Sequence, residues 1–207
     1  MKLISLRLMK ESDICIIARA FKEQGWDKPE SQYKLYYEQH IEETRRVVIA
    51  EYDGEFAGYI TIVFHSLDSY FSERGIPEIV DFNVLIKFRK CGIGSRLMDE
   101  AEEFCFKQYE TIGLSVGLLS DYGSAIRMYV KRGYVPVGDG IKYRNKVLSY
   151  FEQVQVDDDL VLSFTKNRKT ANFEKFLQKK HHNKLILVKS VSETPINNKA
   201  NVLNSFL

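Results

Sequence analysis

The sequence predicts an α/β fold, because strand-like and helix-like segments alternate along it. Residues 78–86 are rich in β-branched and aromatic side chains, which is typical of a buried strand. A glycine-containing loop at 89–94 follows, and beyond it apolar residues recur at helical spacing as far as Gln108. With 207 residues and 44% hydrophobic content, the chain is long enough to bury one good core. We therefore expect one main α/β domain.

The segments on either side of this unit continue the alternation. Ser12 and Asp13 are typical of a helix N-cap, Pro29 suits the first turn of a helix, and Asp53 followed by glycine indicates a hairpin turn. In chain order we expect a strand at 3–8, helices at 12–24 and 29–43, hairpin strands at 46–52 and 56–64, the strand at 78–86, a helix at 95–108, a strand at 114–119, a helix from about 124, and strands at 134–137 and 160–164.

The loop at 89–94 has the composition of an anion-binding turn. Gly92 and Gly94 lack a Cβ and let the main chain curl, so that successive N–H groups point at one oxyanion. The helix that follows exposes unpaired amides in its first turn, and its dipole adds positive potential there. A P-loop would need Gly-Lys-Ser/Thr and a Rossmann fingerprint a third glycine in place of Leu97, and neither is present. The loop therefore predicts a ligand that carries a pyrophosphate.

Composition argues against several other classes of protein. No run approaches the ~18 consecutive apolar residues of a membrane span, and the first residues lack the long apolar segment of a signal peptide. The three cysteines, Cys15, Cys91 and Cys105, are too few and too irregular for a disulfide framework or a zinc site. We expect a soluble, cytoplasmic protein with no membrane partner and no metal.

Two linked motifs carry a family resemblance. The first is Arg-x-x-Gly-x-Gly at 89–94, after a strand that ends near Val84. The second is Ser-Ala-x-x-Met-Tyr at 124–129, followed by Gly-Tyr at 133–134. Together they resemble the acyl-CoA-binding motifs of the GCN5-related N-acetyltransferase (GNAT) superfamily. The resemblance covers roughly residues 1–166 and implies the GNAT (acyl-CoA N-acyltransferase) fold, in which a mixed, largely antiparallel central sheet is flanked by helices and splayed near Val84.

The resemblance also implies acetyl-CoA as co-substrate. Tyr122 stands where the family often carries an asparagine, and a tyrosine hydroxyl is one substitute for that amide. Arg89 either touches phosphate through its guanidinium or caps the loop while its amide binds, and Lys90 is a solvated electrostatic helper. The resemblance assigns to the cofactor Val84, Leu85, Ile86, Arg89, Lys90, Cys91, Gly92, Ile93, Gly94, Ser95, Tyr122, Ser124, Ala125 and Tyr129.

Acyl transfer to an amine needs an uncharged nucleophile, a polarised carbonyl and a proton for the departing thiolate. An alkylammonium of pKa ~10.4 is almost wholly protonated at neutral pH, so a carboxylate base is useful. Glu78 is our first candidate, since its spacing before Arg89 matches the glutamate base of the histone-acetylating branch of the superfamily; Asp81 is the second. Strict strand alternation puts the two carboxylates on opposite faces unless a bulge intervenes. The alternative for Glu78 is an exposed strand end.

Tyr129 matches the usual general acid of the family. A phenol of pKa ~10 can reprotonate a thiolate whose own pKa is ~8.5. The alternative is a packing role, since Ala125, Met128 and Tyr129 form an apolar stripe at helical spacing. Main-chain N–H groups near Val84 are expected to polarise the carbonyl. Cys91 has no evident histidine partner, which favours direct transfer without an acyl-enzyme.

The sequence thus predicts an acyltransferase that moves an acetyl group from acetyl-CoA to the primary amine of a small cationic molecule. Two alternatives stay open: acetylation of a protein lysine or N-terminal amine, and a non-catalytic acyl-CoA-sensing module. Residues 167–207 form a basic extension to which we assign no role. From Lys166 onward the sequence contains nine lysines and arginines but only two glutamates. A short helix at 172–180 is the favoured interpretation there, and we expect no nucleic-acid partner. A homodimer is compatible with the sequence.

Overall fold

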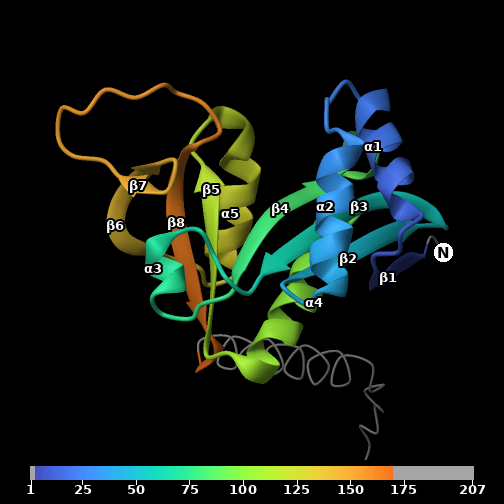
Figure 1. The fold of residues 1–207 in the computed structure, drawn as a ribbon, viewed down its shortest axis with the longest axis horizontal. Coiled ribbons are helices and arrows are strands. Elements are labelled where there is room, and N and C mark those ends of the chain that lie inside the picture. The colour runs from blue at the N-terminus through green and yellow to red at the C-terminus, as the bar shows by residue number, and fades with distance from the viewer. Residues whose placement is uncertain (1–2, 170–207) are drawn as a thin grey trace, which may run out of the picture.

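An open, eight-stranded sheet organises the part of the chain that the computed structural model describes, residues 3–169 (Figure 1). The elements, in chain order, are β1 (Ile4–Leu8), α1 (Asp13–Glu23), α2 (Glu30–Ile41), β2 (Arg45–Tyr52), β3 (Glu55–Val63), α3 (Ser69–Ser72), β4 (Glu78–Val84), a 3₁₀ turn (Ile86–Phe88), α4 (Ile93–Gln108), β5 (Thr111–Gly117), a second 3₁₀ turn (Ser120–Tyr122), α5 (Gly123–Lys131), β6 (Val135–Tyr143), β7 (Lys146–Val147) and β8 (Leu160–Asn167).

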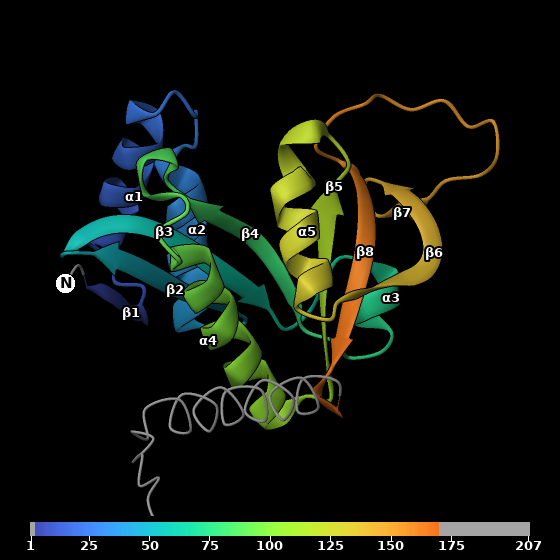
Figure 2. The same cartoon turned by 180° about the vertical axis from the view of Figure 1, so that it is seen from behind.

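The sheet is mixed and largely antiparallel, as predicted. Its strand order is β1-β2-β3-β4-β5-β8-β6-β7, and β4 with β5 is the one parallel pair among the described strands. Helices α1 and α2 cover one face, while α4 and α5 cover the other, as Figure 2 shows from behind. Each face therefore has its own core.

Alternating side chains of the central strands fill these two cores. On the α4 face, Ile60 and Ile79 pack with Leu97 in a cluster that extends to α5. On the α1/α2 face, Phe21 and Tyr59 pack with other buried aromatic and aliphatic side chains. Because successive strand residues point to opposite faces, membership in one cluster or the other shows which way each side chain of the sheet points.

The parallel strands β4 and β5 separate along their length. Their pairing comprises only Glu78 with Gly113 and Ile79 with Leu114, although β4 runs on to Val84. The ribbons diverge beyond that point in both views (Figures 1 and 2). We predicted a splay near Val84, and the structure opens it earlier, directly after Ile79.

Several element boundaries differ from the sequence prediction. Helix α4 begins at Ile93 instead of residue 95, because Gly92, in the left-handed region at φ 85°, already serves as its N-cap. Strand β4 ends two residues early, since Ile86 starts a 3₁₀ turn. Ser12 makes no side-chain capping bond. Instead, the Asp13 carboxylate accepts a hydrogen bond from the Lys10 amide at 2.7 Å. Strand β5 spans 111–117 instead of 114–119, and α3 and β7 were not predicted.

The predicted domain limit at 166 falls one residue before the end of β8. Most of the basic extension, including the helix expected at 172–180, lies outside the described residues. Among residues 3–169, no helix is both long and apolar enough to cross a membrane.

Candidate active site at the splay of β4 and β5

A bulge in β4 sets the direction of its carboxylates. Tyr59 pairs with Asn83 and Thr61 with Val80, so Ile60 alone faces two residues of β4. One of these two, Asp81, has a left-handed backbone with φ 45°. Such an extra residue interrupts the alternation of side chains. As a result Asp81 points to the α1/α2 face, whereas its neighbour Phe82 packs in the α4 core.

Glu78 lies on the same face as Asp81. Its neighbour Ile79 belongs to the α4 core, so the Glu78 side chain points the other way. The guanidinium of Arg45 is close enough to feel the charges of both carboxylates, although burial is the main influence and lowers its pKa. The exception that we allowed for in the sequence, a bulge that brings both candidates to one face, is therefore the arrangement that the structure adopts.

Five donors surround the Asp81 carboxylate. Oδ1 accepts bonds from Lys28 Nζ at 2.9 Å and Asn83 Nδ2 at 2.5 Å. Oδ2 accepts bonds from Tyr59 Oη at 2.6 Å, and from Gln32 Nε2 and Tyr36 Oη, both at 2.9 Å. A carboxylate offers about four lone-pair sites, so these bonds fill the oxygens. Asp81 in this state holds the surrounding donors in place.

The Glu78 carboxyl group has a different environment. It is 7% exposed, and its Oε2 accepts a 2.6 Å bond from the Ser66 hydroxyl. Burial raises its pKa above the usual 4.5, while the hydroxyls of Ser66 and Ser115 oppose the shift. The structure thus rules out the exposed strand end that we gave as the alternative for Glu78. A raised carboxyl pKa is the property of a base that works near neutral pH.

A buried polar network continues from Ser66 to the far strands. The Ser66 oxygen accepts the amide of Asp68, and Asp68 Oδ2 lies 2.6 Å from Lys142 Nζ on β6. Ser163 donates to Asp68 at 3.3 Å and lies 3.0 Å from the Ser115 hydroxyl. Asp68 raises the pKa of Glu78 and Lys142 lowers it, although burial remains the larger influence. The network therefore adjusts the acidity of Glu78 from strands on the other side of the splay.

On the opposite side of β4, the glycine loop has the conformation of an anion cradle. Lys90 and Gly92 are both left-handed, with φ 64° and 85°. The first hydrogen bond of α4 runs from the Arg96 amide to the Gly92 carbonyl at 3.2 Å. The amides of residues 93–95 come before it and therefore have no acceptor within the helix. A Cβ added to Gly94 would come within 3.2 Å of the Phe82 ring, so a glycine is also favoured there. These features fit a phosphate group.

The end of β4 is partly occupied by protein contacts. The Leu85 amide donates to the Ala57 carbonyl at 2.9 Å, and the Ile86 amide donates to Gln24 Oε1 at 3.0 Å. Arg89 donates from Nε to the Val84 carbonyl at 3.4 Å and lies 5.5 Å from the Trp26 ring. These contacts favour the capping interpretation of Arg89 over direct phosphate contact.

The second motif lines the other side of the splay. Tyr129 on α5 is 7% exposed and packs edge-on against Tyr134, with ring centroids 5.9 Å apart. Burial raises the pKa of its hydroxyl well above the ordinary value, which keeps the proton on the phenol. Ala125 lies against the same core, whereas Ser124 is exposed. The structure therefore shows Tyr129 packed in the core, and the packing does not preclude proton donation.

Tyr122 has its own partner. Its hydroxyl donates to Asp158 Oδ1 at 3.0 Å, and its ring lies so close to Gly117 that a Cβ there would approach it to 2.6 Å. Burial raises the pKa of Tyr122 to about 12, and the charge of Asp81 across the splay contributes to the shift. The hydroxyl of Tyr122 is therefore already engaged by Asp158.

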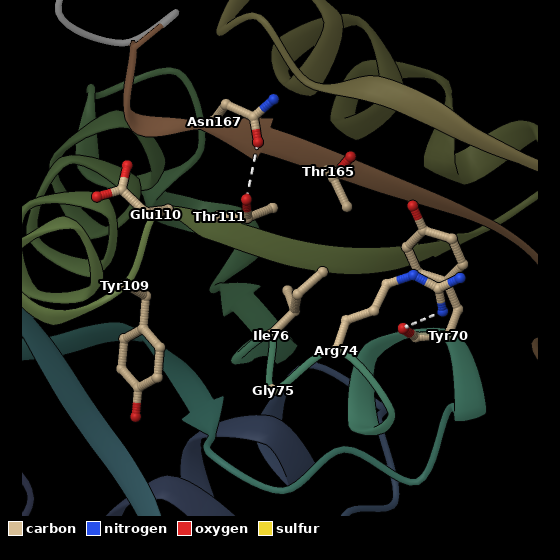
Figure 3. A pocket seen from close by; sticks show the side chains of 9 residues that line it. All are labelled: Tyr70, Arg74, Gly75, Ile76, Tyr109, Glu110, Thr111, Thr165 and Asn167. Atoms are coloured by element: carbon tan, nitrogen blue, oxygen red, sulfur yellow. Dashed lines mark hydrogen bonds between the residues drawn. The ribbon is translucent and has the colours of Figure 1, made fainter.

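A separate cavity of about 410 Å³ lies at the other end of the sheet, beside α3 and the beginning of β5 (Figure 3). Tyr70, Ile76 and Tyr109 are among its lining residues, and the Thr111 hydroxyl donates to Asn167 across one wall at 2.8 Å. Among the residues that the sequence predicted for catalysis and for the cofactor, none lines this cavity. We therefore locate the candidate site at the splay.

Sequence reasoning missed several residues of this site. One of them is Gln32, which lies four residues before Tyr36 on α2, and that spacing was a signal that the two share a face. Lys28 and Lys142 gave no such signal, because their partners Asp81 and Asp68 are distant in sequence.

Comparison with known proteins agrees with this geometry. The family model for the acetyltransferase (GNAT) family matches residues 12–134. No curated protein matches significantly. A chimera of the spermidine N-acetyltransferase SpeG from Vibrio cholerae and hSSAT is 15% identical, with a TM-score of 0.59, and the match covers 81% of this chain and 97% of that one.

Two further solved structures have the same fold. One, called Ard1, from Thermoplasma volcanium, is 22% identical with a TM-score of 0.57, over 79% of this chain and 97% of the other. The ribosomal-protein-S18-alanine N-acetyltransferase of Escherichia coli is 12% identical with a TM-score of 0.58, over 80% and 94%. With the family model spanning more than half of the sequence, the chain belongs to the GNAT family of acetyltransferases.

Proposed function

We propose that this enzyme transfers an acetyl group from acetyl-CoA directly to a primary amine that is cationic in solution. The observation that carries the proposal is the bulge in β4, which puts Glu78 and Asp81 on one face while the glycine cradle lies beyond the other. The two faces would then serve different substrates. Acceptor amine and acyl donor would meet at the opening between β4 and β5.

The cofactor side has a donor set suited to a phosphate-bearing thioester. The amides of 92–95 would hold the pyrophosphate, with Lys90 as an added positive charge and Cys91 in the turn. The main chain at Val84, with Ala125 and Tyr129 opposite, would line the arm that leads to the acyl group. When bound, acetyl-CoA supplies an activated acyl group.

Glu78 is the proposed base. A protonated amine held at Asp81 lies three residues away along the strand, roughly 10 Å, so the proton would travel to Glu78 through water. Burial of Glu78 raises its pKa toward the working range and makes it a better acceptor at neutral pH. Asp81 is proposed to anchor the ammonium group, since its carboxylate already binds an ammonium group, that of Lys28.

Tyr129 is the proposed acid. Its raised hydroxyl pKa keeps it protonated throughout the neutral range and also makes it a weaker acid, so donation would have to be favoured by the negative charge that develops on a departing thiolate beside the hydroxyl. Its ring is fixed by Tyr134, which limits the positions from which the hydroxyl can donate.

The substrate class is inferred from Asp81. Its carboxylate already holds an alkylammonium, that of Lys28, at 2.9 Å, and the Tyr59 hydroxyl accepts a second bond from the same group at 3.4 Å. A substrate of the same chemistry would fit the same partners. The spermidine enzymes among the structural neighbours act on amines of this kind, whereas other neighbours are named for a ribosomal protein.

The small number of cysteines, three in 207 residues, supports a reducing compartment, which we propose to be the cytoplasm. Cys15 and Cys91 are exposed free thiols and Cys105 is a buried one. Free surface thiols persist where the surroundings are reducing.

The decisive experiment combines binding with turnover on one sample. Calorimetry would compare acetyl-CoA with a CoA analogue that lacks the phosphates, and thiol release would then be followed across a panel of alkylamines, polyamines and peptides. Phosphate-dependent binding with release on cationic alkylamines supports the proposal. Release on peptides alone would move the assignment to protein acetylation, and binding without release on any amine would indicate an acyl-CoA sensor.

A further inference from the structure

We propose that Lys28 determines acceptor specificity: its ammonium occupies the subsite of the acceptor ammonium at Asp81, and a cationic acceptor binds only by displacing it. The inference rests on the proposed function, because it takes Asp81 as the anchor of the acceptor. It concerns a residue between α1 and α2 that neither family motif includes.

The surroundings of Lys28 Nζ are those of a bound alkylammonium. It lies 2.9 Å from Asp81 Oδ1 and 3.4 Å from the Tyr59 hydroxyl. It also lies 5.5 Å from the centroid of the Phe21 ring and 6.0 Å from that of Tyr59. A carboxylate, a hydroxyl and aromatic rings are the groups that proteins use to hold amine cations. The Lys28 side chain is 23% exposed, so solvent reaches it.

The Asp81 carboxylate has no room for a second cation. It already accepts five hydrogen bonds, and its two oxygens offer about four lone-pair sites. An incoming ammonium must therefore replace one of the present donors. Two ammonium groups at one carboxylate would also repel each other.

Lys28 is the donor that can leave at the lowest cost. Gln32 and Tyr36 are fixed on α2, and the Tyr59 side chain is fully buried in the α1/α2 core. Asn83 belongs to β4 itself. Lys28 alone among the five lies between elements, in the segment from Gln24 to Pro29, and its long side chain can swing into water without unfolding anything.

In this arrangement the affinity for cationic acceptors depends on the fraction of molecules in which the Lys28 ammonium has moved away from Asp81. The apparent affinity of a ligand falls by the fraction of molecules whose site is available. Amines that are uncharged at the working pH do not compete for Asp81 in this way. Lys28 thus discriminates between acceptors by charge, and it favours those cations whose remaining contacts compensate for its displacement.

The test is calorimetry on the full chain with excess CoA, which permits amine binding without turnover. Benzylamine, a cation at pH 7, is compared with aniline, which has similar shape but is uncharged. The variants are Lys28→Met, Lys28→Arg and Lys34→Met, the last removing an exposed charge from α2 as a matched control. Benzylamine should bind Lys28→Met about tenfold tighter than the wild type. Lys28→Arg and Lys34→Met should resemble the wild type, and aniline should bind all four proteins alike.

Equal benzylamine affinity in Lys28→Met and the wild type, or no binding to either, would overturn the inference. So would an equal gain in Lys34→Met, since that would reflect net charge alone. Thiol release, measured separately, tests the proposed function: an enzyme that acetylates cationic amines while Lys28→Met binds no tighter would refute only the role of Lys28.

Discussion

Lys142 Nζ lies 2.6 Å from Asp68 Oδ2, and the two side chains are 1% and 2% exposed. The pair joins β6 to the segment before α3. Asp68 also accepts the Tyr70 amide, which caps α3. One buried ion pair therefore connects the fold of this region to the acidity of Glu78, whose pKa responds to both partners.

Lys142→Met should destabilise the protein by about 3–5 kcal/mol, because it leaves a buried carboxylate without its counter-charge. Urea denaturation would measure this loss. The double variant Asp68→Asn/Lys142→Met should recover much of it, since asparagine can still accept the Tyr70 amide. Equal stability of the single and double variants would mean that the charge of Asp68 is not what destabilises the fold.

Glu78→Gln should lower turnover by on the order of 10²-fold or more and abolish the rise of rate with pH that the base produces. It should not destabilise the fold at pH 7. A carboxyl whose pKa is raised by folding stabilises the protein fully only at low pH, and that contribution is lost as pH rises through the folded-state pKa. Glutamine resembles the protonated form and escapes the loss. A pH–rate profile checks the expected loss of turnover, and a melting curve at pH 7 checks the expected stability. An unchanged pH–rate profile would exclude Glu78 as the base.

Tyr129→Phe should keep acetyl-CoA affinity and lower kcat by on the order of 10²-fold, because it removes one hydroxyl and preserves the ring packed against Tyr134. Calorimetry and steady-state rates separate the two quantities. Tyr134→Phe is the matched control, since that hydroxyl is buried without a hydrogen-bond partner among the described residues. Comparable rates in both variants would assign Tyr129 to packing alone.

Gly92→Asp should weaken acetyl-CoA binding by about tenfold or more. No atom lies within 4 Å of an added Cβ, so steric conflict is absent; the left-handed backbone and the new negative charge at the helix start are the causes. Gly54→Asp is the control, with φ 82° and equally open space in the β2–β3 turn. Equal affinity in the two variants would remove the loop from the cofactor site.

The sequence predicted most elements because their periodicity and their glycine turns are local features. Strand β4, helix α4 and the β2–β3 hairpin were found within a few residues. The four-residue helix α3 was not, since it is held by Asp68, whose partner Lys142 is 74 residues away. The acceptor side was equally hard to foresee, because Asp81 gathers donors from three other elements or segments.

From the sequence, whether Glu78 and Asp81 point to the same face of the sheet depended on whether the strand contains a bulge. Strict alternation separates Glu78 from Asp81, and a bulge reverses that result. Nothing in the residues 78–84 by themselves fixes a bulge at Asp81; the register of β3 against β4 does. Long-range pairing therefore decided the one geometric question on which the choice of base depended.

The extra residue in β4 makes the number of residues in this strand as important as their identity. Removing one residue between Val80 and Phe82 would relieve a left-handed backbone that costs of order 1–2 kcal/mol. The sheet would become more regular, but the donors that now bond to Asp81 would lose their shared acceptor. In the shortened strand, simple alternation would decide which face of the sheet each following side chain points to. The site would also lose the carboxylate of Asp81. Insertions and deletions in this strand, more than substitutions, should mark the branch points at which related sequences exchange one acceptor for another.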